Sequence, residues 1–261
     1  METPTFKTRE ELYTWLKENK EDIIYSKKSQ FKKADGFGAP CTSMQQIHKI
    51  STKDLTASEP NSIKVRAIIN TTMIMDSHKD VHINGIWNKT VKENKRIKHI
   101  QEHEMKFDKI ISDKEDLDVY VKQYNWKDLG YDVEGKTEAL VFDSVIKRQR
   151  NAYMYEQYKD GNVDNHSVGM YYVNIKMAFN SSLDEDAEYK EIWDEHIDDI
   201  ANKEEVEKNG YFYAVYEAKA IEGSAVAIGS NPITPTETIS KTKTQQELKN
   251  LEIKKWLGVA E

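Results

Sequence analysis

Residues 63–75 read IKVRAIINTTMIM, and this stretch begins the regular part of the chain. Its β-branched side chains favour extended backbone, so it predicts one or two strands. Shorter stretches of the same kind predict further strands near 97–103, 107–112, 117–123, 167–177, 211–219 and 221–229.

Two helices are expected between these strands. Residues 136–159 give the stronger prediction, because their apolar side chains recur at helical spacing. Gly161 follows and can end this helix, since glycine tolerates left-handed backbone. Residues 86–95 predict a short helix, after a turn at 76–85. The apolar positions of the longer helix are Phe142, Val145, Ile146, Ala152 and Tyr153.

The first sixty residues are expected to form an N-terminal arm, residues 1–60. Residues 3–26 predict one surface helix, which begins with a capping box of Thr8 and Glu11. Residues 27–60 are rich in Lys, Ser, Gly and Thr and predict a linker. The apolar stripe of the helix is Leu12, Trp15 and Leu16.

The remaining chain divides into a main domain, 61–232, and a tail, 233–261. Residues 180–209 are strongly acidic and predict helices that are inserted between two strands of the main domain. The tail predicts a Thr- and Pro-rich linker and then a helix from about Thr244.

Composition limits the classes of function. The 261 residues are 38% hydrophobic and 32% charged, with a formal net charge of −7. Nucleic-acid binding favours a basic surface, so this charge argues against nucleic acid as the main partner. No stretch is long and apolar enough to predict a membrane span, and the N-terminus lacks the pattern of a signal peptide. The single cysteine, Cys41, cannot form an internal disulfide, which favours a cytoplasmic protein.

Ser167 is a candidate nucleophile. It lies in DGNVDNHSVGMYYV (160–173), where a turn gives way to a strand, and the nearby amides of Val168 and Gly169 can stabilise an oxyanion. A serine is also common at the start of a strand without any catalytic role. Because side chains alternate along a strand, one face is expected to carry Ser167, Gly169, Tyr171, Val173 and Ile175.

His103 and Glu222 are candidates for the groups that activate this serine. A serine hydroxyl needs a base to take its proton, and the pKa of histidine lies near neutrality. A third group must orient the imidazole, and Glu222 stands between two apolar stretches, where burial is costly unless the acid is paired. The simpler alternatives are a surface histidine and a solvent-facing glutamate.

A metal site is the competing interpretation. His78 and His82, and likewise His99 and His103, are four residues apart, a spacing that places two ligands on one face of a helix. However, these stretches predict a turn and a strand, and the sequence has no HExxH or CxxC motif. A metal-dependent hydrolase therefore remains an alternative, and no metal or cofactor is expected.

The order of these motifs resembles the prohead (capsid maturation) serine protease family of tailed bacteriophages, which is related to herpesvirus assemblin. The resemblance covers about 63–232. Lys109 departs from a usual proline, and Gly223 from a usual aliphatic residue. Assemblin-like enzymes use a second histidine as the third group, and His166 and His82 are the other candidates for it. The matching residues, in order, are Asp76 and Asp80, Gly85-Ile86-Trp87, His103-Glu104, Ser167-Val168-Gly169-Met170, Glu222-Gly223-Ser224-Ala225-Val226 and Ser230-Asn231-Pro232.

This resemblance implies an α+β fold, with a small, mostly antiparallel β-barrel surrounded by helices. It implies a serine endopeptidase with Ser167, His103 and Glu222 as the catalytic residues. Its expected substrates are the phage major capsid protein and the scaffold protein, and the linkers 27–60 and 233–243 are expected sites of self-cleavage. Such an enzyme acts in the host cytoplasm, inside the immature capsid, without nucleic acid or membrane, and homo-oligomers are compatible with the resemblance. The alternative is a non-catalytic scaffold or virion assembly protein with the same fold.

Overall fold

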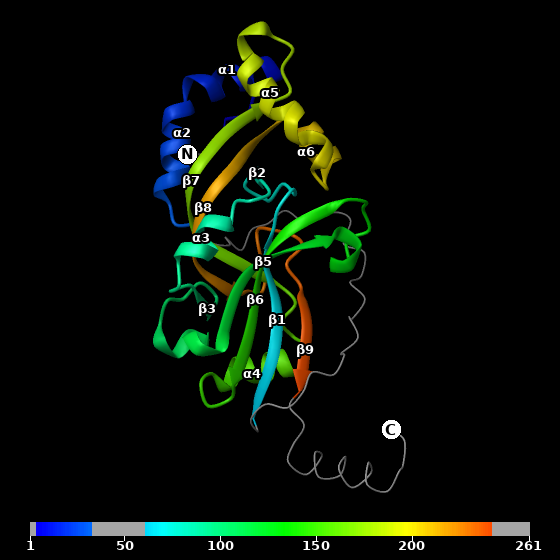
Figure 1. Ribbon diagram of the computed structural model, residues 1–261. Coiled ribbons are helices and arrows are strands. Elements are labelled where there is room, and N and C mark those ends of the chain that lie inside the picture. The colour runs from blue at the N-terminus through cyan, green and yellow to red at the C-terminus, as the bar shows by residue number, and fades with distance from the viewer. Residues whose placement is uncertain (1–3, 33–60, 242–261) are drawn as a thin grey trace, which may run out of the picture.

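The computed structural model describes residues 4–32 and 61–241, whose strands form two sheets (Figure 1). One sheet has four strands in the order β5-β6-β1-β9, and the other has five strands arranged around β8. Most pairings are antiparallel, so the expected α+β class with mainly antiparallel strands is confirmed. Within the described residues the strands do not close into a barrel, since each sheet keeps its own edge strands.

The four-stranded sheet is built on β1, the strand that the opening stretch of sequence predicts. β1 pairs antiparallel with β6 on one side and with β9 on the other, and β5 pairs with β6. The 236–241 segment was expected to be a linker, but it forms β9 because the edge of β1 offers backbone partners. The strands are β1 (Ser62–Thr71), β5 (Leu117–Asn125), β6 (Lys136–Lys147) and β9 (Thr236–Lys241).

The prediction of one helix over 136–159 is wrong for its first half. Lys136–Lys147 form strand β6, and only α4 (Ala152–Lys159) is helical. Residues 139–142 are all buried, and β6 has a strand on each side. A short apolar run fits a central strand as well as a helix, and the pairing with β1 and β5 decides for the strand. The expected helix end is confirmed, because α4 stops just before Gly161, which has a φ of +75°.

The second sheet is organised by β8, which is one long strand rather than the two that were expected. β7 pairs antiparallel with β8 along almost its whole length. On the other side β2 and then β3 pair with β8, both in parallel, and β4 pairs with β3. The strands are β2 (Asp80–His82), β3 (Lys98–Gln101), β4 (Ile110–Ser112), β7 (His166–Phe179) and β8 (Tyr211–Ala225).

β7 contains irregularities that change which side chains share a face. The register with β8 shifts after Gly169 and twice more near Asn174. Tyr171 is 40% exposed whereas Ile175 is 6% exposed, so the expected common face breaks before Ile175. The main hydrophobic cluster takes side chains from both sheets, which joins them: Val65, Phe142, Val168, Met170 and Ala220 are among its members.

The predicted N-terminal helix is two helices, α1 (Arg9–Glu18) and α2 (Lys20–Ser29), which meet at Asn19. Thr8 Oγ1 accepts from the backbone N–H of Glu11, as the capping pattern predicts. α2 packs along β7 (Figure 1). The other helices are α3 (Asn88–Glu93), α5 (Ala187–His196) and α6 (Lys203–Asn209), and the short 3₁₀ helices are Phe107–Lys109, Lys114–Asp116, Trp126–Leu129, Asp184–Asp186 and Ile197–Asp199.

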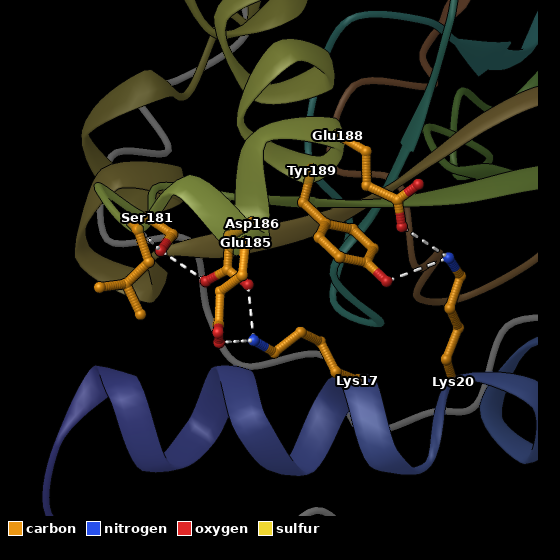
Figure 2. A network of polar contacts seen from close by, with 8 residues as sticks. Lys17, Lys20, Ser181, Glu185, Asp186, Glu188 and Tyr189 are labelled. Atoms are coloured by element: carbon orange, nitrogen blue, oxygen red, sulfur yellow. Dashed lines mark hydrogen bonds and ion pairs between the residues drawn. The ribbon is translucent and has the colours of Figure 1, made fainter.

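The acidic insertion packs against the N-terminal helices through ion pairs (Figure 2). Lys17 Nζ lies 2.7 Å from Glu185 Oε1 and 2.6 Å from Asp186 Oδ1, and Lys20 Nζ lies 3.1 Å from Glu188 Oε1. The Asp186 side chain is fully buried, so Lys17 supplies the charge that makes its burial tolerable. The insertion is helical and lies between β7 and β8, as the sequence predicts.

A buried ion pair also fixes α2 to the Asp-x-x-x-Asp turn. Asp76 Oδ1 accepts from the N–H groups of His78 and Asp80, which closes the expected turn before β2. Lys27 pairs with Asp80, whose side chain is fully buried. Burial and then the charge of Asp80 raise the pKa of Asp76 to about 7, whereas Lys27, opposing the effect of burial, helps to hold the pKa of Asp80 low.

No helix among the described residues is long and apolar enough to cross a membrane. The helix expected from Thr244 lies outside the described residues.

Candidate functional site

A strained turn at the end of β3 positions His103. Glu102 and His103 have φ values of 53° and 56°, in the left-handed region that costs a non-glycine residue about 1–2 kcal/mol. The N–H of Glu102 donates to Ala225 O, and the N–H of His103 donates to Ser224 Oγ, both at 3.0 Å. The turn is therefore held by β8, and strain that is held in this way is typical of functional sites.

His103 and Glu222 are in direct contact. His103 Nδ1 lies 2.5 Å from Glu222 Oε1, and the two side chains are 4% and 0% exposed. Ser224 Oγ donates to the other carboxylate oxygen, Glu222 Oε2, at 2.6 Å. Both oxygens of this buried acid are thus paired. With Nδ1–H donating to the carboxylate, Nε2 of His103 is the nitrogen that can accept a proton.

Ser167 lies on the same face as this pair. It is directly opposite Ser224 in the β7–β8 ladder, and such pairs have Cβ atoms about 4.5–5.5 Å apart on one face. Ser167 is 4% exposed, and within the described part of the chain its hydroxyl makes no hydrogen bond to His103. The structure therefore joins His103 to Glu222 and places Ser167 on the same face, opposite Ser224. Catalytic hydrogen bonds are often long until substrate binds.

The backbone amides near Ser167 differ in direction. The N–H of His166 donates to Thr234 Oγ1 and the N–H of Met170 donates to Lys32 O, so both point away from β8. Alternation along the strand directs the N–H of Val168 the same way. Of the amides expected to stabilise an oxyanion, that of Val168 is the best placed.

Gly169 allows the carboxylate of Glu222 to lie against β7. A Cβ at Gly169 would be 1.9 Å from Glu222 Oε1 and 2.5 Å from Phe31 Cζ. The glycine of the Ser-x-Gly pattern thus has a physical role that the sequence alone does not reveal. At Gly223, Phe142 fills the space that a side chain would need, because its Cε2 lies 2.5 Å from a hypothetical Cβ.

Replacing Gly169 with alanine is expected to displace the Glu222 carboxylate, because a 1.9 Å contact cannot be accommodated. We expect a loss of about 1–3 kcal/mol in the free energy of unfolding, measured by urea denaturation. Gly161→Ala is the matched control, because its Cβ would meet nothing within 4 Å and only the positive φ is penalised. A Gly169→Ala protein as stable as the wild type would contradict the close approach.

A chain of buried hydrogen bonds lies behind Ser167 and fixes two other histidines. His166 Nδ1 lies 2.9 Å from Thr234 O, and since a carbonyl only accepts, His166 donates there. Tyr158 OH then donates to His166 Nε2 at 2.9 Å and accepts from His99 Nε2 at 3.1 Å. Ser144 Oγ donates to His99 Nδ1 at 2.7 Å. Both histidines are neutral in this arrangement.

Neither alternative for the third group is bonded to His103. His166 is committed to Tyr158 and Thr234. His82 Nδ1 lies 3.0 Å from Asn70 Oδ1, and its Nε2 lies 3.3 Å from Tyr172 OH. Glu222 is therefore the member of the three candidates that contacts the imidazole of His103.

His99 and His166 are expected to remain uncharged at pH values well below 7. Burial lowers the pKa of His166 to about 4 and that of His99 to about 3, from an ordinary value of 6.5. Their contribution to stability is complete above pH 6.5 and is lost as the pH falls toward 4, because only the unfolded chain takes up protons there. NMR titration of the ring protons checks this: signals of both rings that shift at pH 6–7 would contradict the buried chain.

Among the described residues, neither histidine pair belongs to a group of three side chains that could hold a metal ion. His99 lies in β3 and bonds to Ser144 and Tyr158, whereas His103 lies in the turn after β3 and bonds to Glu222. His82 bonds within the core, to Asn70 and Tyr172.

One cluster of described acids, at Asp113, Glu115 and Asp116, has oxygens within 4.8 Å of one another. Arg150 pairs with Asp113 at 2.8 Å and Lys147 pairs with Asp116 at 2.7 Å. These ion pairs offset the charge of two of the three acids.

Comparison with known proteins gives no relative: no family model, curated protein or solved structure matches the chain.

Proposed function

We propose that the chain is a serine endopeptidase in which Ser167 is the nucleophile, His103 the base and Glu222 the group that orients His103. The observation that carries this proposal is the buried contact between His103 and Glu222 on the face that also holds Ser167. A buried carboxylate against one imidazole nitrogen leaves the other nitrogen basic, which is what activation of a serine requires. The strained backbone at His103 supports the same assignment.

In the proposed reaction, Ser167 Oγ attacks the scissile carbonyl while Nε2 of His103 takes the hydroxyl proton. The N–H of Val168 donates to the oxyanion. His103 then gives its proton to the leaving amine, and an acyl-enzyme remains. Water, deprotonated by the same nitrogen, hydrolyses the ester, and Glu222 stabilises the charged imidazole in both steps. Substrate binding must bring Ser167 Oγ and His103 Nε2 into hydrogen-bond reach.

The proposed biological role is capsid maturation in a tailed bacteriophage. It rests on the ordered resemblance to prohead proteases over 63–232, to which the structure adds contacts among three of its motifs. Glu222 and Ser224 of one motif meet His103 of the second, and Gly169 of the third lies under Glu222. The substrates would be the major capsid protein and the scaffold protein, inside the immature capsid in the host cytoplasm.

An active-site probe tests the chemistry. Diisopropyl fluorophosphate is attacked by an activated serine at phosphorus and loses fluoride, which leaves a stable adduct. We expect one adduct, mapped to Ser167 by mass spectrometry, in the wild type and none in His103→Ala. An unlabelled but folded wild-type chain, or a label elsewhere, would reject the assignment.

Co-expression with the major capsid protein of the same phage tests the role. Intact mass should show truncated capsid protein with the wild type but not with His103→Ala. Self-cleavage is expected in the same experiment within 33–60, because the helix α2 and the strand β9 occupy parts of the two linker zones that the sequence favours. Intact chains after prolonged incubation of active enzyme would reject self-cleavage.

A non-catalytic assembly protein with the same fold is the second candidate. The observation in its favour is the missing hydrogen bond between Ser167 and His103 among the described residues. The fluorophosphate experiment distinguishes the two candidates. A peptidase forms an adduct at Ser167, whereas an assembly protein, whose Ser167 is not activated, forms none.

A further inference from the structure

β7 has an edge that faces away from β8, and a short piece of the chain's own N-terminal segment pairs with it. The N–H of Met170 donates to Lys32 O at 3.1 Å, and the N–H of Lys32 donates to Met170 O at 2.9 Å. The pairing is antiparallel. This edge of β7, near Ser167, therefore already binds an extended peptide through its backbone.

The side chain of Phe31 lies beside Gly169 and the carboxylate of Glu222. Phe31 Cζ would be 2.5 Å from a Cβ at Gly169, at the point where Glu222 Oε1 would be 1.9 Å away. The ring and the carboxylate are thus neighbours on one face of β7. Phe31 also contacts Tyr171, with ring centroids 5.2 Å apart. An aromatic side chain at this position covers the carboxylate that His103 contacts.

The side chain of Lys32 lies on the opposite face. Its ammonium group is 5.5 Å from the ring centroid of Tyr172. Because the pairing with Met170 is antiparallel, a peptide in this register runs from the position of Phe31 toward Ser167. An aromatic residue followed by a basic residue would then stand on the N-terminal side of the bond that Ser167 attacks.

We propose that the β7 edge at Gly169 and Met170 is the substrate-binding site for an extended peptide with an aromatic side chain over Gly169, and that Phe31–Lys32 occupies this site in the free enzyme. The inference rests on the proposed peptidase function and adds its substrate class. Displacement of Phe31–Lys32 must precede binding of a separate substrate. A segment of the same chain competes strongly, since linkage gives it a millimolar effective concentration.

A binding experiment with a chain that cannot cleave tests this. The probe is a fluorescein-labelled peptide with the sequence of residues 27–33, KKSQFKK, and fluorescence anisotropy measures its dissociation constant. We expect the peptide to bind the Ser167→Ala, Phe31→Ala double variant about tenfold more tightly than Ser167→Ala alone. The same peptide with alanine in place of phenylalanine should show no such gain, which controls for attraction between a basic peptide and an acidic protein.

Equal or weaker binding to the double variant would overturn the proposal, since Phe31 would then be part of the fold or of the site itself. Tyr25→Ala, at an exposed position of α2, is the matched control and should change nothing. Lys32→Pro removes the N–H that Met170 O accepts and should give the same gain if Phe31→Ala fails to fold. The binding experiment needs no peptide cleavage. A wild-type chain without peptidase activity would therefore reject the proposed function, whereas the peptide-binding result would still show whether Phe31–Lys32 occupies the site.

Discussion

Ser167→Ala is expected to lower kcat/KM for peptide cleavage by about 10⁴-fold or more, with little change in stability. The hydroxyl of Ser167 makes no hydrogen bond to its described neighbours, so its removal leaves no buried group unpaired. The measurement is cleavage of a quenched fluorescent peptide, beside a urea denaturation curve for each protein.

Ser224 provides the matched control because it stands directly opposite Ser167 on the same face. Its hydroxyl accepts from the N–H of His103 and donates to Glu222 Oε2, so its proton is already committed. We expect Ser224→Ala to cost about 1–3 kcal/mol in stability and to reduce activity only partly, by about 10–100-fold. Complete loss in Ser224→Ala with full activity in Ser167→Ala would move the nucleophile to Ser224.

Glu222→Gln is expected to lower kcat by about 10⁴-fold while the chain stays folded. In the wild type, Ser224 Oγ donates to Glu222 Oε2. The side-chain amide of glutamine is therefore best placed with its oxygen toward Ser224. Its NH₂ group then faces His103 Nδ1 and forces the proton onto Nε2. That nitrogen can no longer accept the proton of Ser167.

Glu102→Gln is the control for this substitution. It removes the same charge, but from an exposed side chain next to His103 in the sequence. It should leave kcat within a few-fold of the wild type. A Glu222→Gln protein with nearly full activity would show that His103 is oriented by another group, and the role proposed for Glu222 would be wrong.

The strands near Ser167 and His103 were predictable because their patterns are local. The first part of the 63–75 stretch, which forms β1, the strand at Ser167 and the turn at 76–80 follow from β-branched residues and from capping by short acids. β6 was not predictable in the same way, since ALVF at 139–142 fits a buried helix and a central strand alike. Only the pairing with β1 and β5, which are distant in sequence, decides between them.

Some residues of the candidate site were likewise predictable from the sequence, and others were not. Residue chemistry and motif order select Ser167, His103 and Glu222. The contribution of Ser224 depends on two hydrogen bonds, one within β8 and one from the turn after β3, and the need for Gly169 depends on a carboxylate from the neighbouring strand. The one available signal was the Glu-x-Ser spacing, because side chains two apart on a strand share a face. Phe31 carries no sequence signal, since its place over Gly169 is set by α2.

The ion pair between Lys27 and Asp80 has a consequence for proteolysis of this chain. A cut between 33 and 60 would give two polypeptides, but the smaller one would carry the only described ammonium group that pairs with the buried Asp80. Its release would leave a carboxylate in the core without a counter-charge, and Tyr13, Leu16 and Ile23 would lose their buried contacts as well. Such a protein would run as two bands in denaturing electrophoresis and as a single particle in gel filtration.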